Sequence, residues 1–145
     1  MAPALEAEVR AANEAFYLAF RERDVDAMER LWAQEAPVAC MHPGMGVVSG
    51  REAVLASWRG ILRHPGAPSL SCSKVTVHLL GTSAFVTCLE GQKGKRARLI
   101  ATNVFVREDG HWRLVHHHAA PLAPSAIPDR PPTDPDIQID PSEWN

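Results

Sequence analysis

An Asp-Gly dipeptide between two strand-like runs is the feature that most constrains the fold of this chain. Asp109-Gly110 separates two segments that are rich in apolar, β-branched and aromatic residues. Asp-Gly favours the positive φ angles of a two-residue turn, and the twist of that turn matches two antiparallel strands. The sequence therefore predicts a β-hairpin made of the strands Ala97–Arg107 and Trp112–Ala119.

Two polar residues interrupt the apolar character of this hairpin. Asn103 lies next to Val104 in one strand, and His117 lies two residues from both Val115 and Ala119 in the other. A polar group among core-forming residues must be hydrogen-bonded or must face a cavity. We therefore expect the hairpin to form one wall of a pocket.

Helices are expected in the N-terminal half of the chain. Apolar residues at three- and four-residue spacing predict a helix over residues 5–20, and Asp24 is a suitable N-cap for a second, shorter helix. Ser49 and Glu52 have the spacing of a capping box, which predicts a third helix that ends near His64.

Further strands follow these helices. They are expected at Val38–His42, Lys74–Leu79 and Ala84–Glu90. This order predicts an α+β fold, a cone-shaped, strongly bent antiparallel sheet covered by about three N-terminal helices. The helices would cover the concave face and leave a cavity. The apolar convex face would then be buried in a homodimer.

A change in composition marks the end of the expected domain. Seven prolines occur from Pro121 onward, and proline is incompatible with a sheet interior or a long helix. We therefore expect one domain over residues 1–121 and a proline-rich tail over residues 122–145. The tail is expected to be an extended segment that docks through its apolar residues Ile137, Ile139 and Trp144, on its own chain or on a partner chain. The alternative is a disordered tail.

Charge and cysteine content limit the partners and the compartment. The formal net charge is −2 with no basic run, so we expect no nucleic-acid partner. No apolar run approaches the ~20 residues of a membrane helix, and the N-terminus lacks the pattern of a signal peptide. Cys40, Cys72 and Cys88 occur singly in expected strands, which predicts buried, reduced thiols in a cytoplasmic protein.

A histidine and a glutamate at strand ends are candidates for acid/base chemistry. His42 ends a strand next to a Pro-Gly turn, so its ring either faces a cavity mouth or forms structural hydrogen bonds. Glu90 ends another strand and is either solvated or in contact with a ligand.

A metal site or cofactor is not expected. His116, His117 and His118 are consecutive, and successive strand residues point to opposite faces, so the three rings do not converge on one ion. The chain also lacks zinc-type ligand spacing and a glycine-rich phosphate loop.

Four segments, in order, carry a resemblance to a known family. They are 16–26 leading to Leu31-Trp32, then 38–43, 50–54 and 109–115. With these segments the chain resembles the nuclear-transport-factor-2-like superfamily, also called the SnoaL-like or ketosteroid-isomerase-like fold, over about residues 5–121. The resemblance implies the cone-shaped fold. It is compatible with isomerases, cyclases, dehydratases, epoxide hydrolases and non-catalytic assembly domains.

The resemblance to ketosteroid isomerases also suggests roles for individual positions. The place of their general-base aspartate is His42 here, and the place of their oxyanion-hole aspartate is Asn103. The place of their oxyanion-hole tyrosine is Phe16, with Tyr17 beside it. The resemblance thus implies a modified acid/base site with His42 as base and Asn103 as donor to a developing oxyanion.

The hairpin also resembles the association domain of calcium/calmodulin-dependent kinases. A similar Asp-Gly-x-Trp turn leads there into His-x-His. The pocket arginines of that family correspond to Asn103 and Ala119 here, so an anionic ligand at those two positions is not expected.

Together these features predict a pocket for a small hydrophobic organic molecule. The first hypothesis is a cofactor-independent acid/base enzyme of the isomerase, dehydratase or cyclase type, acting on a small hydrophobic or polycyclic substrate. The alternative is a non-catalytic ligand-binding or dimerisation module. The expected catalytic residues are His42, Asn103 and His117. The expected substrate-contacting residues are Phe16, Tyr17, Trp58, Glu90 and Phe105.

Overall fold

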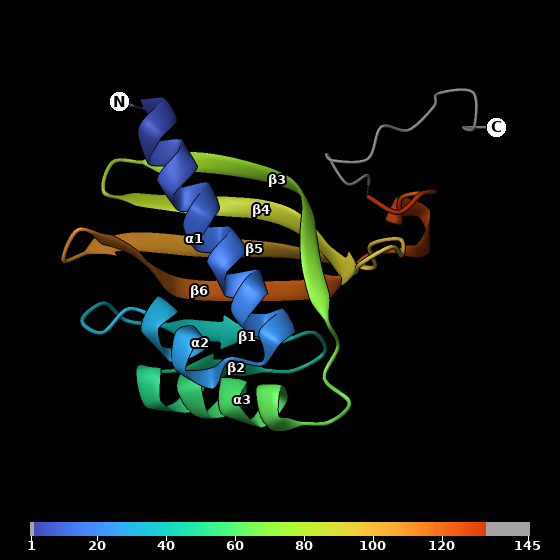
Figure 1. The fold of residues 1–145 in the computed structure, drawn as a ribbon, viewed down its shortest axis with the longest axis horizontal. Helices are drawn as coiled ribbons and strands as arrows, with labels where there is room; N and C mark the ends of the chain where they lie inside the picture. Colours follow the sequence, from blue (N-terminus) through green and yellow to red (C-terminus); the bar gives the residue numbers. More distant parts are fainter. Residues whose placement is uncertain (1, 133–145) are drawn as a thin grey trace.

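Three helices precede most of the sheet in the computed structural model, which describes residues 2–132 (Figure 1). They are α1 (Ala2–Glu22), α2 (Val25–Leu31) and α3 (Arg51–Arg63). Asp24 is the N-cap of α2, as predicted, because its Oδ1 accepts a hydrogen bond from the Ala27 N–H at 3.0 Å. None of the helices in residues 2–132 combines the length and the apolar character that a membrane span requires.

The expected capping box at the start of α3 is wrong. Ser49 lies in a short strand, and the N-cap is Gly50, with a φ of 90° and no side-chain hydrogen bond. Glycine adopts this φ without the steric cost that other residues incur, so the chain passes from strand to helix within one residue. Arg51 then fixes the helix start, because its guanidinium donates to the carbonyls of Trp32 and Ala33 at 2.8 and 2.9 Å.

Within residues 2–132, six strands form one mixed sheet in the order β2-β1-β6-β5-β4-β3. They are β1 (Ala39–Met41), β2 (Val47–Ser49), β3 (Leu70–Leu80), β4 (Ser83–Gln92), β5 (Leu99–Glu108) and β6 (His111–Pro121). All neighbouring strands are antiparallel except β1 and β6, which run parallel. The α+β class is therefore confirmed, with β2 as a strand that the sequence did not indicate.

The predicted hairpin is formed by β5 and β6. Glu108 pairs with His111, which leaves only Asp109 and Gly110 in the turn. Their φ angles are 50° and 77°, and a type I′ turn requires positive values at both positions. The local turn chemistry thus determined the pairing of two strands.

Two β-bulges bend the sheet. The β3–β4 register shifts between Ser73 and Thr76, where Lys74 has a φ of 50°, and the β5–β6 register shifts opposite Val104 and Phe105. Bulges add a residue to one strand and increase its bend and twist. The sheet consequently curves around α1, which lies across its concave face and contacts β3, β4 and β6 (Figure 1).

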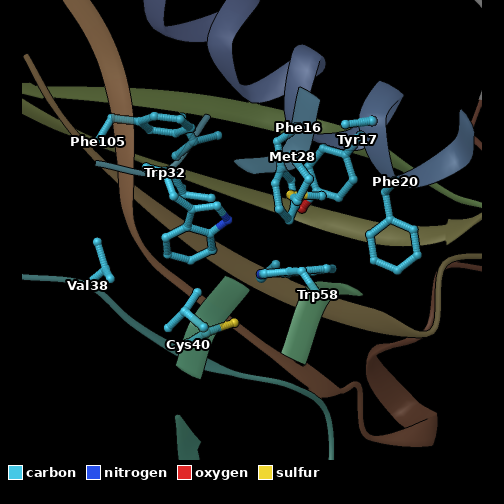
Figure 2. Packing of buried hydrophobic residues seen from close by; sticks show 14 of the residues in the cluster. Phe16, Tyr17, Phe20, Met28, Trp32, Val38, Cys40, Trp58 and Phe105 are labelled. Atoms are coloured by element: carbon cyan, nitrogen blue, oxygen red, sulfur yellow. The ribbon is translucent and has the colours of Figure 1, made fainter. Parts of the chain in front are cut away.

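The hydrophobic core lies between α1, the concave face of the sheet and α3. Figure 2 shows its aromatic side chains, with Phe16 and Phe20 from α1 approaching Trp58 from α3. The ring of Trp58 meets these two phenylalanines edge-on, with centroid distances of 5.3 and 5.4 Å. Each such buried side chain contributes about 1.5–3 kcal/mol, which makes this cluster a main source of stability.

The cysteines are free, but not all are buried. Cys40 and Cys88 are buried as expected, whereas the expectation of burial is wrong for Cys72, which is half-buried. Cys72 lies on β3, the strand at one edge of the sheet, where only one neighbouring strand covers it.

The tail is described as far as residue 132. Leu122 N–H donates to the carbonyl of Arg98 at 2.8 Å, and a 3-10 turn at Pro124–Ala126 follows, so this part is not simply extended. Residues 128–132 and strand residues such as Leu89 border one hollow of about 860 Å³. The expectation for Ile137, Ile139 and Trp144 lies outside the described residues.

Candidate functional site

Five buried polar side chains form one hydrogen-bonded cluster between α1 and the sheet. α1 supplies Asn13 and Tyr17, β4 supplies Glu90, β5 supplies Asn103 and β6 supplies His117. None of these five residues is more than 2% exposed. We call them the polar cluster.

The register of the hairpin brings two members of the polar cluster together. Asn103 and His117 are direct partners in the β5–β6 ladder. The bulge in β6 adds Val115, so the buried positions pass from Leu114 to His117 instead of alternating strictly. The bulge therefore turns His117 toward α1, on the same face as the tryptophan and leucine that precede it.

The hydrogen bonds of Asn103 fix the proton on His117. Asn103 Nδ2 donates to Asn13 Oδ1 at 2.9 Å and to the Tyr17 hydroxyl at 3.2 Å, so its Oδ1 is an acceptor. His117 Nδ1 lies 2.6 Å from that oxygen and must carry the hydrogen. His117 Nε2 therefore presents a lone pair.

Tyr17 connects this amide to the carboxyl group of Glu90. Its hydroxyl accepts from Asn103 and donates to Glu90 Oε2 at 2.5 Å, and it also lies 3.2 Å from the Cys88 Sγ. The same Glu90 oxygen lies 4.0 Å from His117 Nε2. The lone pair of His117 and the carboxyl of Glu90 thus face each other across a short gap.

Burial shifts the protonation equilibria of the polar cluster. Desolvation raises the pKa of Glu90 from 4.5 to about 7, against the opposing effect of the Tyr17 hydrogen bond. Desolvation, with smaller contributions from neighbouring histidines, lowers the pKa of His117 to about 3. Desolvation and the nearby Glu90 charge raise the pKa of Tyr17. Near neutral pH, Tyr17 is therefore protonated, His117 is neutral, and Glu90 populates both forms.

Most of the residues named from the sequence lie in or beside the polar cluster. Phe16 and Trp58 pack against the His117 ring, with centroid distances of 5.0 and 5.7 Å. Phe105 is also buried, but it lies at the other end of the core, near Trp32 (Figure 2).

His42 lies beside the polar cluster, because its ring centroid is 6.5 Å from that of His117. The Trp58 ring centroid is 4.8 Å from His42 and 5.7 Å from His117, and no hydrogen bond joins His42 to the polar cluster among residues 2–132. His42 Nε2 lies 3.0 Å from Ser57 Oγ, and both residues line a separate hollow of about 410 Å³. Burial lowers the pKa of His42. His42 is therefore a neighbour of His117, but within residues 2–132 it is not hydrogen-bonded to Asn103.

Asn13 and Cys88 are parts of the site that the sequence analysis missed. Asn13 occupies the apolar stripe of α1, four residues after Val9 and three before Phe16, and a polar residue at such a position indicates a buried partner. Cys88 precedes Glu90 by two residues on β4, so the two side chains share a face.

A resident metal ion finds no ligand set in the described part of the chain. No group of three His, Cys, Asp or Glu side chains within residues 2–132 is arranged to hold an ion. His116 and His118 lie on one face of β6 with ring centroids 6.3 Å apart, while His117 lies on the other face.

A cavity of about 320 Å³ borders the polar cluster at the turn between β4 and β5. Its wall includes Glu90, which belongs to both the cavity and the polar cluster. The other lining residues are Leu70, Gly91, Gln92, Lys95, Arg96, Arg98 and Leu99. We call it the mouth cavity.

A sequence profile and a solved structure both support membership of the SnoaL-like/NTF2-like superfamily. The sequence profile of the SnoaL-like domain matches residues 9–124. A candidate dehydratase of the NTF2-like family from Streptomyces avermitilis has 31% identical residues and a TM-score of 0.76, over 85% of this chain and 99% of that one. A candidate calcium/calmodulin-dependent protein kinase type II association domain from Thiobacillus denitrificans has 36% identity and a TM-score of 0.66, over 79% of this chain and 94% of that one.

A plant protein shares part of the sequence. The F-box protein SKIP8 of Arabidopsis thaliana is 30% identical over 108 residues, which are 74% of this chain and 47% of the plant protein. The chain therefore spans about half the length of that curated relative.

Proposed function

The chain belongs to the SnoaL-like domain family, and on that premise we propose that it is a cofactor-independent acid/base enzyme acting on a small organic molecule. Its reaction would be of the dehydratase, isomerase or cyclase type. The similarity to a candidate dehydratase over almost the whole of that protein supports the first of these.

The observation that carries this proposal is the buried Glu90 carboxyl beside His117. A general acid/base works best with a pKa near the operating pH, and burial raises the pKa of Glu90 to about 7. The Tyr17 hydroxyl holds the carboxyl in place, and the lone pair of His117 Nε2 faces it at 4.0 Å. Pairs of titratable groups with pKa values pushed apart are typical of acid/base sites.

In a dehydration, one carboxyl group suffices to move the proton. Ionised Glu90 removes a proton from the carbon next to a carbonyl group. It then donates this proton to the departing hydroxyl, which leaves as water. An oxygen about 2.8 Å from both Glu90 Oε2 and His117 Nε2 would form an angle of about 90° across their 4.0 Å gap, so the same hydroxyl can accept from one and donate to the other. Return of the proton to a different carbon would give an isomerisation instead.

Exchange of carbon-bound protons with solvent tests this proposal without knowledge of the substrate. The purified chain is incubated in D₂O with a panel of β-hydroxy ketones and β-hydroxy acids, and deuterium incorporation is followed by NMR. We expect exchange with the wild type and a loss of about 100-fold in Glu90→Gln, because general acid/base groups typically contribute at least that much. Glu22→Gln, an exposed α1 variant, is the matched control. Absence of exchange across the panel, or equal rates in Glu90→Gln, would contradict the proposal.

The alternative function is a non-catalytic ligand-binding or dimerisation module. It is favoured by the packing of Phe16 and Trp58 against His117, because these rings occupy the interior where a large substrate would sit. The 36% identity to a candidate kinase association domain also supports it. In that case native mass spectrometry would find a bound small molecule or a dimer, but wild type and Glu90→Gln would exchange no carbon-bound protons.

We also propose a homodimer that buries the convex face of the sheet. This face carries Leu80 and Ile100, whose side chains are 59% and 46% exposed in the single chain. Phe85 and His78 stack on the same face at 4.4 Å. Size-exclusion chromatography with light scattering of Ile100→Glu checks this, because a charge there would disfavour the dimer. A cytoplasmic location, in which free thiols persist, is proposed on the basis of the three unpaired cysteines.

A further inference from the structure

The mouth cavity carries a concentration of positive charge that the polar cluster does not use. Lys95, Arg96 and Arg98 line it and are exposed. None of the three side chains forms an ion pair or hydrogen bond with any residue of the described chain. The other charged wall residue, Glu90, directs its carboxyl to Tyr17.

The turn that carries these cations is held against β4 by its backbone. Arg98 N–H donates to the Glu90 carbonyl at 3.2 Å, and Lys95 N–H donates to Gln92 at 3.0 Å. Gly91 allows a close approach, because a Cβ atom on it would lie 2.9 Å from the Ala97 Cα. The three cations are therefore attached to a positioned turn beside the end of β4.

We propose that the mouth cavity binds the carboxylate of a small organic acid and directs its apolar body toward Glu90. This inference rests on the proposed function, because it names the substrate class of the same site. A guanidinium matches a carboxylate with two parallel hydrogen bonds, and two arginines with a lysine surround the opening. Leu70 and Leu99 provide an apolar wall for the remainder of the molecule.

The size and surroundings of the cavity favour a small monocarboxylate over larger anions. Its volume of about 320 Å³ is at the lower end of the range for ligand pockets. The net charge of −2 is unlike that of a nucleic-acid-binding domain. This anion site is also distinct from Asn103 and Ala119, the positions that correspond to the pocket arginines of the kinase association domains, because those two side chains carry an amide and a methyl group.

Binding of matched acids and amides tests the inference directly. Benzoate, cinnamate and phenylbutyrate are compared with their neutral amides, and with inorganic phosphate, by thermal shift and calorimetry on the full chain. We expect at least one acid to bind about tenfold more tightly than its amide, because only the acid can accept charge-assisted hydrogen bonds. Equal binding of acids and amides, or binding of phosphate alone, would overturn the inference.

Variants of the turn locate the site. The double substitution Arg96→Gln with Arg98→Gln is expected to weaken acid binding by at least about tenfold. Lys93→Gln is the matched control, since Lys93 lies on the same turn but does not line the mouth cavity. An equal loss in Lys93→Gln would indicate a general surface field and would contradict the site.

Acid binding and proton exchange, measured separately, distinguish this inference from the proposed function. Glu90→Gln is expected to bind acids while losing proton exchange, because it keeps the three cations of the mouth cavity but removes the acid/base carboxyl. Acid binding without proton exchange in the wild type would support the carboxylate site and reject the enzyme. Proton exchange at equal rates with acids and with amides would support the enzyme and reject the carboxylate site.

Discussion

The Tyr17 hydroxyl donates a hydrogen bond to Glu90 Oε2 at 2.5 Å, inside a core where neither residue is more than 2% exposed. A buried carboxyl with a single strong donor is only partly compensated for the loss of water. Desolvation therefore outweighs the hydrogen bond, and the pKa of Glu90 is raised to about 7. This single pair links the stability of the fold to the proton that the site is proposed to transfer.

The stability of the chain is expected to fall as the pH rises through the pKa of Glu90. The folded-state pKa lies above the ordinary value of 4.5, so the favourable contribution is complete below about pH 4.5 and is lost as the pH passes about 7. This difference in the pKa of Glu90 between the folded and the unfolded chain corresponds to about 3 kcal/mol of unfolding free energy. Urea unfolding of wild type and Glu90→Gln between pH 5 and 8 measures it, since glutamine cannot ionise.

The Glu22→Gln variant provides the control for this titration, because Glu22 is exposed on α1. Its unfolding free energy should follow the wild-type pH profile. Parallel profiles of wild type and Glu90→Gln would show that Glu90 does not change its protonation between the folded and unfolded chain.

Asn103 is expected to be replaceable by aspartate only at a large cost. Its Nδ2 donates to both Asn13 and Tyr17, and an aspartate, even when protonated, has one hydrogen to donate. Asn13→Asp is the matched control, because it also buries a carboxyl but keeps the oxygen that accepts from Asn103. Chemical denaturation should show Asn103→Asp to be less stable than Asn13→Asp by about 2 kcal/mol. Equal losses would mean that the donor role of Asn103 is unimportant.

The sequence indicated much of the fold because its main signals are local. The hairpin depends on Asp109-Gly110, and both residues adopt the φ angles that the dipeptide favours. β2 and the parallel pairing of β1 with β6 were not indicated, because strands of three residues are too short to show a period. Ser49 was misassigned for the same reason, since its place in β2 removed it from the helix start.

The site could be predicted only in part from the sequence. Asn103 and His117 were recognised as polar residues among core positions, and they are hydrogen-bonded partners. The inward orientation of His117 depends on the bulge at Val115, which alternation alone does not reveal. The position of His42, with its ring 6.5 Å from His117 and 4.8 Å from Trp58, depends on tertiary contacts with no local sequence signal.

Glu108 is expected to stabilise the bend that follows α2. Its carboxylate accepts hydrogen bonds from the N–H groups of Gln34, Glu35 and Ala36 at 2.8, 3.0 and 2.8 Å. Burial alone would raise the pKa of Glu108, but these three donors outweigh it and lower the pKa. The contribution of Glu108 to the free energy of unfolding is therefore present at neutral pH and is lost as the pH falls through its folded-state pKa. Glu108→Gln should cost about 1 kcal/mol at neutral pH, and less in acid.

The neighbouring Glu35 serves as the control for Glu108, because it is exposed on the same bend and its replacement by glutamine changes the net charge equally. Thermal unfolding of the two variants at neutral and acidic pH compares them. An equal loss in Glu35→Gln would attribute the effect to net charge and not to the three backbone hydrogen bonds.

Two glycine-to-alanine substitutions are expected to have opposite effects on stability. Gly60 lies inside α3, and a Cβ atom on it would meet no atom within 4 Å, so Gly60→Ala should stabilise the chain by about 0.5–1 kcal/mol. Gly110 has a φ of 77° in the hairpin turn, so Gly110→Ala should destabilise it by about 1 kcal/mol. Urea unfolding at neutral pH measures both. A neutral Gly110→Ala would be inconsistent with a type I′ turn at the centre of the hairpin on which Asn103 and His117 are paired.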